Sequence, residues 1–184
     1  MSKPEPILPQ PQSVTITVEK SALLVLDISQ RCADPNIACH KLGPRMKTFL
    51  DRARDVGLPI IYTISTRLKG TPEGQVYSVL ERRPSEPVIF PNSFDKFAGG
   101  ELQSFLSLFD VDTLIITGYR SNVSVLNTAT KATRELKYKV VIPIDGLAAE
   151  TDYEQQYTLF QFTVLPTQAA ELFTFTTLDT ISFR

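Results

Sequence analysis

Apolar segments that alternate with amphipathic helical segments constrain the fold of this chain more than any other feature. One of them, SALLVLDIS at residues 21–29, is a near-continuous apolar run, typical of a strand buried on both faces. The predicted strands are residues 21–29, 58–65, 87–91, 113–119, 139–146 and 172–182. Apolar residues at helical spacing predict the helices, which are residues 41–57, 99–110, 122–138 and 150–164.

Strands separated by single helices require right-handed parallel crossovers. The sequence therefore predicts a three-layer α/β/α sandwich with a mainly parallel, Rossmann-like six-stranded sheet. Residues 1–12 are rich in proline and predict an extended arm or a disordered tail, and residues 13–184 predict a single domain.

Composition narrows the function classes. The net charge is −1, which disfavours nucleic acid as a partner, and no apolar run approaches the ~18 residues needed to span a bilayer. We therefore expect no membrane contact, a small-molecule ligand and a cytoplasmic location. Two cysteines, Cys32 and Cys39, are too few for a disulfide framework and predict free thiols. With His40 as its one histidine, the chain predicts no metal and no cofactor.

Ligands of parallel α/β sheets bind beyond the carboxyl ends of the strands. Asp27 ends the run LLVLD, where partial desolvation would suit a carboxyl group to proton transfer; capping a loop is the alternative role. The rule selects Asp27, Ser65 to Arg67, Phe90 to Asn92, Gly118 to Ser124, and Asp145.

The segment TGYRSNVSV joins a predicted strand to a predicted helix. Gly118 allows a sharp turn, and Ser121 or Asn122 can serve as the helix N-cap. The free amides of the first turn, from Asn122 to Ser124, would then form an anion or oxyanion site. The Ser124 hydroxyl either faces the cleft or satisfies a backbone carbonyl.

Four blocks add up to a family resemblance: ALLVLDISQ, NSFDKFAGGELQSFL, VDTLIITGYRSNVSVLNTATKA and YKVVIPIDGLAAET. In this order and at these spacings they resemble the isochorismatase-like hydrolases, a superfamily that includes nicotinamidases and N-carbamoyl amidohydrolases. The resemblance covers residues 21–164. It implies an active site at the carboxyl edge of the sheet, a dimer or tetramer, and a position at Tyr119–Arg120 where the family often has a non-proline cis peptide bond.

Amide-cleaving members of this superfamily resemble one another in a triad of Asp, Lys and Cys. Asp27 matches the aspartate, and the cysteine falls on Ser124. Alignment on Phe97 and Gly99 places the lysine at Asn92, or at Pro91 with a shift of one residue. The resemblance therefore implies that both the cysteine and the lysine are replaced. Lys96 belongs to the following turn, and the sequence leaves open whether it substitutes for the missing ammonium.

A serine hydroxyl needs a strong base beside it to act as a nucleophile, so acylation of Ser124 is not expected. The isochorismatase branch hydrolyses a vinyl ether without a covalent nucleophile, and there an aspartate such as Asp27 supplies the proton. Its dianionic substrate implies cationic side chains, for which Arg120 and Arg67 are candidates. The nicotinamidase branch is set aside, because its metal site is built largely from histidines.

Two hypotheses follow. The first is an isochorismatase-like hydrolase that acts on a small anionic molecule, with Asp27 as general acid or base. The second is a catalytically silent relative that binds small molecules or forms oligomers. The predicted catalytic residues are Asp27, Ser124 and Asn92, and the predicted substrate-binding residues are Arg120, Ser121, Asn122, Arg67 and Lys96.

Overall fold

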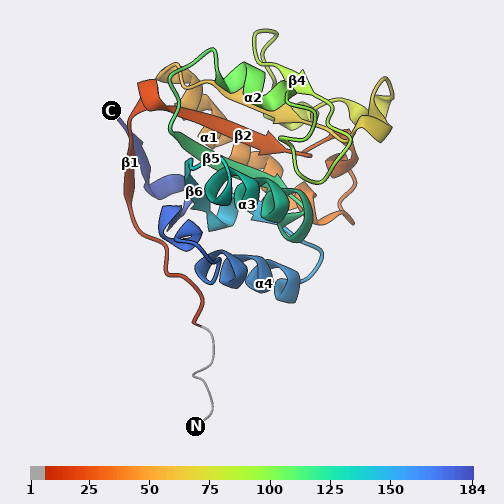
Figure 1. Cartoon of the computed structure of the whole chain (residues 1–184). Helices are drawn as coiled ribbons and strands as arrows, with labels where there is room; N and C mark the ends of the chain where they lie inside the picture. The colour runs from red at the N-terminus through yellow and green to blue at the C-terminus, as the bar shows by residue number, and fades with distance from the viewer. Residues whose placement is uncertain (1–6) are drawn as a thin grey trace.

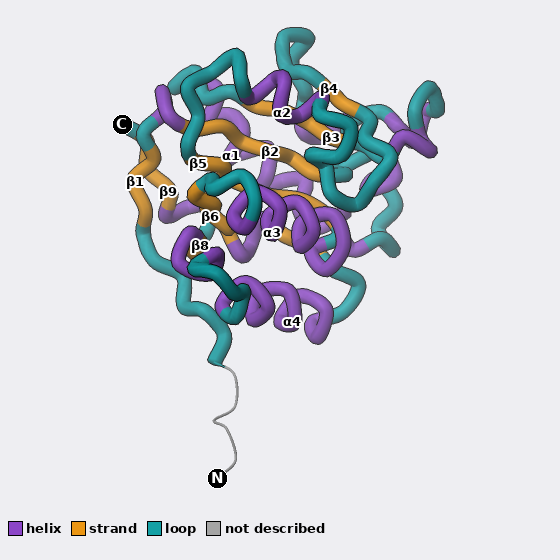
Figure 2. Tube along the Cα trace, viewed as in Figure 1, coloured by secondary structure: helices purple, strands orange, loops and turns teal. Residues whose placement is uncertain are grey.

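The computed structural model describes residues 7–184, which form a three-layer α/β/α sandwich (Figures 1 and 2). Its main sheet has the strand order β4-β3-β2-β5-β6-β8, and every strand pair in it is parallel. The predicted fold class is confirmed. The sheet has seven strands rather than six, because the short β7 pairs with the carboxyl end of β5.

The strand bounds explain where the predictions and the structure differ. The predicted C-terminal strand is interrupted by a 3-10 turn at Leu178–Thr180 and becomes two strands, and the second of them pairs with an N-terminal strand that the sequence did not reveal. The strands are β1 Val14–Ile16, β2 Ser21–Leu26, β3 Ile60–Thr63, β4 Val88–Ile89, β5 Thr113–Tyr119, β6 Lys139–Pro143, β7 Leu147–Ala148, β8 Phe173–Thr176 and β9 Ile181–Phe183.

The four predicted helices are present but shorter. Gly99 and Gly100 both have left-handed backbone angles, so the second helix begins only at Glu101. The third begins with a π-helical turn, Ser121–Val125, and ends before Lys137, whose φ is positive. The helices are α1 Gly43–Asp55, α2 Glu101–Leu106, α3 Leu126–Arg134 and α4 Asp152–Thr163.

Both faces of the sheet are covered, as a central parallel strand requires. On β2, Leu23 and Val25 belong to the core on the α1 side, whereas Leu24 and Leu26 belong to the core shared with α2, α3 and α4. All six β2 residues are buried. This explains why the strand reads as a continuous apolar run that ends at the first polar residue, Asp27.

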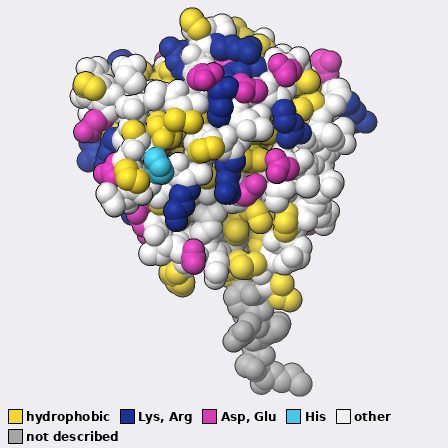
Figure 3. All heavy atoms as spheres, turned by 180° about the vertical axis from the view of Figure 1, so that it is seen from behind, with side chains coloured by type: hydrophobic (Ala, Val, Ile, Leu, Met, Phe, Trp, Pro, Cys, Tyr) yellow, Lys and Arg dark blue, Asp and Glu magenta, His cyan; other side chains and the backbone are white. Residues whose placement is uncertain are grey.

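The predicted arm falls partly outside the described residues, since these begin at residue 7. Residues 7–13 form neither helix nor strand, and the Gln12 N–H donates to the Phe175 carbonyl at 2.8 Å. Within residues 7–184, no helix has the length and apolar character that crossing a bilayer demands. The face turned away from the view of Figure 1 carries basic and acidic side chains interspersed (Figure 3).

The two cysteines correct a prediction. Cys32 and Cys39 form a disulfide, so the expectation of free thiols is wrong. Two cysteines do not make a framework, but these two lie in consecutive 3-10 turns, Gln30–Ala33 and Ala38–Leu42, that fold back on each other. Disulfides are typical of oxidising compartments, so one ground for a cytoplasmic location is removed, and that location stays a prediction.

Candidate active site

Asp27 stands at the carboxyl end of β2, at the centre of the sheet. Its N–H donates to the Thr63 carbonyl of β3 at 2.8 Å, and its φ of 54° turns the chain away from the strand direction. Gly118 permits the neighbouring β5 to pass close by, because a Cβ at this position would lie 2.3 Å from the Leu26 carbonyl oxygen. The local backbone therefore demands glycine beside the acid.

Ser124 contacts Asp27 from a segment that is distant in the sequence. After β5, the Tyr119–Arg120 peptide bond is cis, and the π-helical turn that follows carries Ser124. The Ser124 hydroxyl donates to Asp27 Oδ2, across 97 residues of sequence. The two groups that the sequence analysis assigned to one site are thus in direct contact.

Lys96 completes a three-residue cluster, and this corrects the sequence analysis. Its Nζ lies 2.8 Å from Asp27 Oδ2, and its side chain is only 2% exposed. The Nζ also donates to the Ser93 carbonyl at 3.3 Å, and the Lys96 N–H donates to Thr128 Oγ1 of α3 at 3.0 Å. The expectation of a missing ammonium is wrong, because the turn before Phe97 folds Lys96 back toward Asp27.

Asn92, to which the alignment assigned the lysine position, lies on the cavity lining and is exposed. It makes no side-chain hydrogen bond to Asp27 within the described chain. The lysine directly before the aromatic Phe97 was the available signal, but a linear spacing rule cannot represent a turn that reverses direction.

The two partners of Asp27 share one oxygen. Lys96 and Ser124 both contact Oδ2, while Oδ1 is buried and has no hydrogen-bond partner among residues 7–184. A buried carboxylate oxygen without a partner costs free energy unless a ligand or water occupies it. Within residues 7–184, Oδ1 is therefore the oxygen of this carboxyl group whose hydrogen-bonding capacity is unused.

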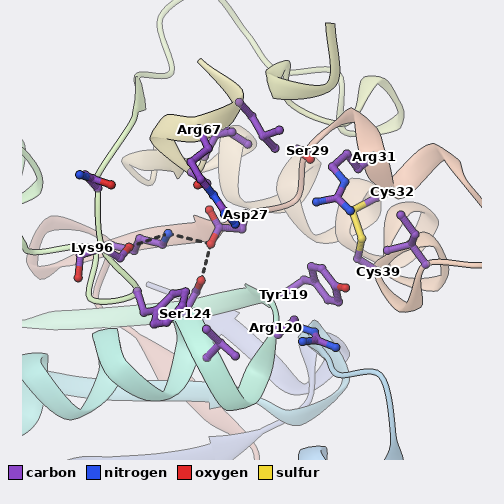
Figure 4. Close-up of a pocket in the computed structure, with 18 residues that line it drawn as sticks. Asp27, Ser29, Arg31, Cys32, Cys39, Arg67, Lys96, Tyr119, Arg120 and Ser124 are labelled. Atoms are coloured by element: carbon purple, nitrogen blue, oxygen red, sulfur yellow. Dashed lines mark hydrogen bonds and ion pairs between the residues drawn. A yellow bond between two sulfur atoms is a disulfide. The ribbon is translucent and has the colours of Figure 1, made fainter. Parts of the chain in front are cut away.

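Above Asp27 lies a cavity of about 520 Å³, within the size range of small-molecule sites (Figure 4). Asn92, Lys96, Arg67 and Arg120 line it together with Asp27 and Ser124, so six of the eight predicted site residues meet here. Its apolar lining includes Ile64, Leu68, Phe94 and Val123.

Ser121 and Asn122 are the two predicted residues that do not line the cavity. Ser121 is fully buried, and the Asn122 amide donates to Glu154 Oε1 of α4 at 3.2 Å. Neither caps the helix, since Arg120 holds the N-cap position without a side-chain bond. The Val123 N–H donates to the Arg120 carbonyl at 3.1 Å, so this amide, too, is committed within the turn.

The arginines of the site differ in their surroundings. Arg120 Nε lies 3.6 Å from Glu150, which also accepts a hydrogen bond from the Tyr119 hydroxyl. Burial and the neighbouring Glu150 carboxylate raise the pKa of Tyr119, so this hydroxyl stays a donor. Arg67 is exposed and has no ion-pair partner in the described part of the chain.

Arg31 and the Cys32–Cys39 disulfide also line the cavity, and the sequence analysis missed both. Arg31 lies four residues after Asp27, in the loop that leaves the carboxyl end of β2. The sheet-edge rule could have included this loop, since loops at that edge carry the binding residues of such folds.

Comparisons with known proteins agree with this fold. A family model described as the Isochorismatase domain matches residues 21–174. An isochorismatase family protein from Desulfovibrio vulgaris is similar in structure, with a TM-score of 0.73 and 21% identity over 87% of this chain and 95% of that one. N-carbamoylsarcosine amidase from Thermoplasma acidophilum gives a TM-score of 0.71 and 22% identity, over 87% and 97%.

The nicotinamidase/pyrazinamidase PncA from Bacillus subtilis gives a TM-score of 0.73 at 16% identity, over 85% of this chain and 99% of that one. A search of curated proteins found no match. Likenesses at these identities show a shared fold, and the side chains of the site have to be judged by their own chemistry.

Proposed function

Because this chain belongs to the isochorismatase family of hydrolases, we propose that it hydrolyses a small anionic molecule, with Asp27 as general acid and base and without a covalent nucleophile. One observation carries the proposal. Asp27 Oδ2 is held by Lys96 and Ser124 at the floor of a cavity of about 520 Å³, while Oδ1 has no partner among residues 7–184.

The cluster suits proton transfer because each group has a separate task. The Lys96 ammonium and the Ser124 hydroxyl fix the carboxyl group by one oxygen, so the other keeps a constant orientation. Oδ1 takes the proton of an attacking water, or delivers one to the substrate, within hydrogen-bond reach. The buried ammonium lies near enough to offset negative charge that develops in the transition state.

Ser124 serves as an orienting contact in this proposal. A serine hydroxyl is a weak nucleophile without a strong base, and its proton is already donated to a carboxylate that also faces an ammonium. Hydrolysis of a vinyl ether, as in the isochorismatase branch, requires no acyl-enzyme and so no thiol at this position.

The cavity lining supports an anionic substrate. Arg67 and Arg120 line it with Lys96, and Asp27 is the one carboxylate among its described lining residues. Arginine recognises carboxylates in bidentate geometry, and the neutral Asn92 amide offers further hydrogen bonds at the rim. Apolar walls around Ile64 and Phe94 suit the carbon skeleton of the same molecule.

The test is turnover of isochorismate and of a panel of anionic vinyl ethers, esters and amides by the purified chain. We expect at least one substrate to be hydrolysed, and Asp27→Asn to lower kcat/KM by about 10²–10⁴-fold, the usual contribution of acid–base catalysis. Asp179→Asn is the matched control, because Asp179 is an exposed aspartate outside the cavity, and it should leave the rate unchanged.

A catalytically silent binding protein is the second candidate. It is favoured by the absence of a thiol at position 124 and by the commitment of Asp27 Oδ2 to two protein partners. A chain that binds anions in this cavity but hydrolyses none of the panel would support this candidate over the hydrolase. Hydrolysis that Asp27→Asn leaves at the full rate would instead contradict the role proposed for Asp27.

A further inference from the structure

The side chains that line the cavity carry more positive charge than its one lining carboxylate, Asp27, neutralises. Four cationic side chains line it, of which Lys96 pairs with Asp27 and Arg120 lies 3.6 Å from Glu150. Arg31 and Arg67 have neither an ion pair nor a side-chain hydrogen bond within residues 7–184. One of these two, Arg67, is already a candidate for an anionic group, which leaves Arg31 without an assigned role.

Arg31 lines a side of the cavity that none of the predicted site residues occupies. It lies in the 3-10 turn Gln30–Ala33, directly before Cys32, and Figure 4 shows Arg31 and Lys96 on opposite sides of Asp27. A ligand held over Asp27 would therefore meet the Lys96 ammonium on one side and the Arg31 guanidinium on the other. A planar guanidinium is the side chain best matched to a carboxylate or phosphate.

The disulfide forms the same wall. Cys32 and Cys39 are 1% and 0% exposed, and they line the cavity together with Ile37 and Arg31. Among the described residues, the hydrogen bonds of the loop between them are local, such as that from Asn36 N–H to Asp34 Oδ1. Besides the disulfide, a hydrogen bond of 2.9 Å between His40 Nδ1 and the Cys32 carbonyl connects the two ends of this loop.

We propose that Arg31 is a specificity-determining residue that binds an anionic group of the ligand, and that the Cys32–Cys39 disulfide fixes its wall, so that ligand affinity depends on the redox state of the chain. The proposal rests on the proposed function for the cavity being the substrate site. It adds a residue and a redox dependence that the proposed hydrolysis does not require.

The redox step needs a dithiol as co-reactant. The dithiol supplies two electrons and two protons, the Sγ–Sγ bond breaks, Cys32 and Cys39 become thiols, and the reductant is oxidised to a cyclic disulfide. Without that bond, the His40 contact is the hydrogen bond that joins the loop ends within residues 7–184. The loop therefore gains freedom, and ordering the Arg31 side chain on binding costs more entropy.

The experiment measures binding by calorimetry with the full chain. The probes are three benzenedicarboxylates, which place two carboxylates at three separations, and benzoate, which carries one. For the oxidised wild type we expect the tightest dicarboxylate to bind at least about tenfold more tightly than benzoate, the effect of one charge-assisted hydrogen bond. Arg31→Gln should remove this preference, Arg31→Lys should restore part of it, and Arg134→Gln, an exposed arginine of α3, should keep it.

The redox arm uses wild type reduced with dithiothreitol and the Cys32→Ser/Cys39→Ser variant, with thiol counts and circular dichroism to verify reduction and folding. Both should lose the preference as Arg31→Gln does. Absence of the preference in oxidised wild type, its persistence in Arg31→Gln, or its persistence in the folded double variant would overturn the proposal. These outcomes are independent of turnover, so a failure of hydrolysis with intact Arg31-dependent binding contradicts only the proposed function.

Discussion

At the scale of single residues, the sequence resemblance implies that position 124 distinguishes this chain from the amide-cleaving members. There the family motif carries cysteine, whereas here a serine hydroxyl donates to Asp27 Oδ2, beside the Lys96 ammonium at 2.8 Å. Against the triad that the resemblance implies, the carboxylate and the ammonium are in contact, and a hydroxyl takes the place of the thiol. A thiol in this position would face both a proton acceptor and a positive charge, the two conditions that favour a reactive thiolate.

Replacing the hydroxyl by a thiol should therefore create a reactive nucleophile. Ser124→Cys is expected to react with iodoacetamide about tenfold or more faster than a free cysteine at neutral pH, because the ammonium stabilises the thiolate. The wild type supplies a clean background, since both of its cysteines are in the disulfide. The rate is measured by intact-protein mass spectrometry over time.

The matched control is Ser124→Cys combined with Lys96→Met, which removes the ammonium and keeps a long side chain. This variant should react at the rate of an ordinary thiol. Equal rates for the two variants would show that Lys96 does not act on position 124, and would contradict the cluster as an electrostatic unit.

At the scale of elements, a buried ion pair joins α1 to the segment that leads into β4. Arg54 of α1 donates to Glu86 at 2.7 and 2.9 Å and to the Leu80 carbonyl at 3.2 Å. Burial opposes the charge on Glu86, but bonds from Arg54 and from the Arg83 N–H outweigh it and hold the pKa of Glu86 below its ordinary value. The pair anchors the end of the segment that joins β3 to β4.

Glu86→Gln should lower the free energy of unfolding at neutral pH by about 3–5 kcal/mol, because it leaves the buried Arg54 without its carboxylate. Since the folded pKa of Glu86 is depressed, its contribution is fully present above the unfolded pKa of about 4.3 and is lost as pH falls through the lower folded value. The difference between the two proteins should therefore shrink as urea titrations move from about pH 7 to about pH 2.

Glu135→Gln is the control for this titration, since Glu135 forms an exposed pair with Lys131. It should leave the stability and its pH dependence close to those of the wild type. A difference between Glu86→Gln and wild type that stays constant down to the lowest pH would contradict the role assigned to the Glu86 charge.

The elements were largely predictable, because strands that are buried on both faces, such as β2, β3, β5 and β6, have near-continuous apolar sequences. The site was predictable where chain direction alone decides, as at Asp27 and Ser124, which follow neighbouring parallel strands. Lys96 was not, because its place depends on a turn closed by a bond from its N–H to Thr128, more than thirty residues away. The disulfide was missed for a related reason, since the number of cysteines does not tell how close the two lie in the folded chain.

At the scale of the whole molecule, segments that are distant in the sequence converge on the site. The β2–β5 pairing brings Asp27 next to the turn that carries Ser124, and the turn before Phe97 adds Lys96, so three distant segments close around one cavity. A buried ammonium, a carboxylate with a free oxygen and an open cavity are features that folding alone does not require, and such features are typical of functional sites.

The most direct measurement compares Ser124→Ala with Asp27→Asn on one hydrolysed substrate, in single-turnover reactions that are also sampled by intact-protein mass spectrometry. The account predicts that Ser124→Ala keeps its rate within about tenfold of wild type, that Asp27→Asn loses about 10²–10⁴-fold, and that no covalent adduct forms. A substrate-derived mass on wild type that disappears in Ser124→Ala together with activity would contradict it, because the serine would then be the nucleophile.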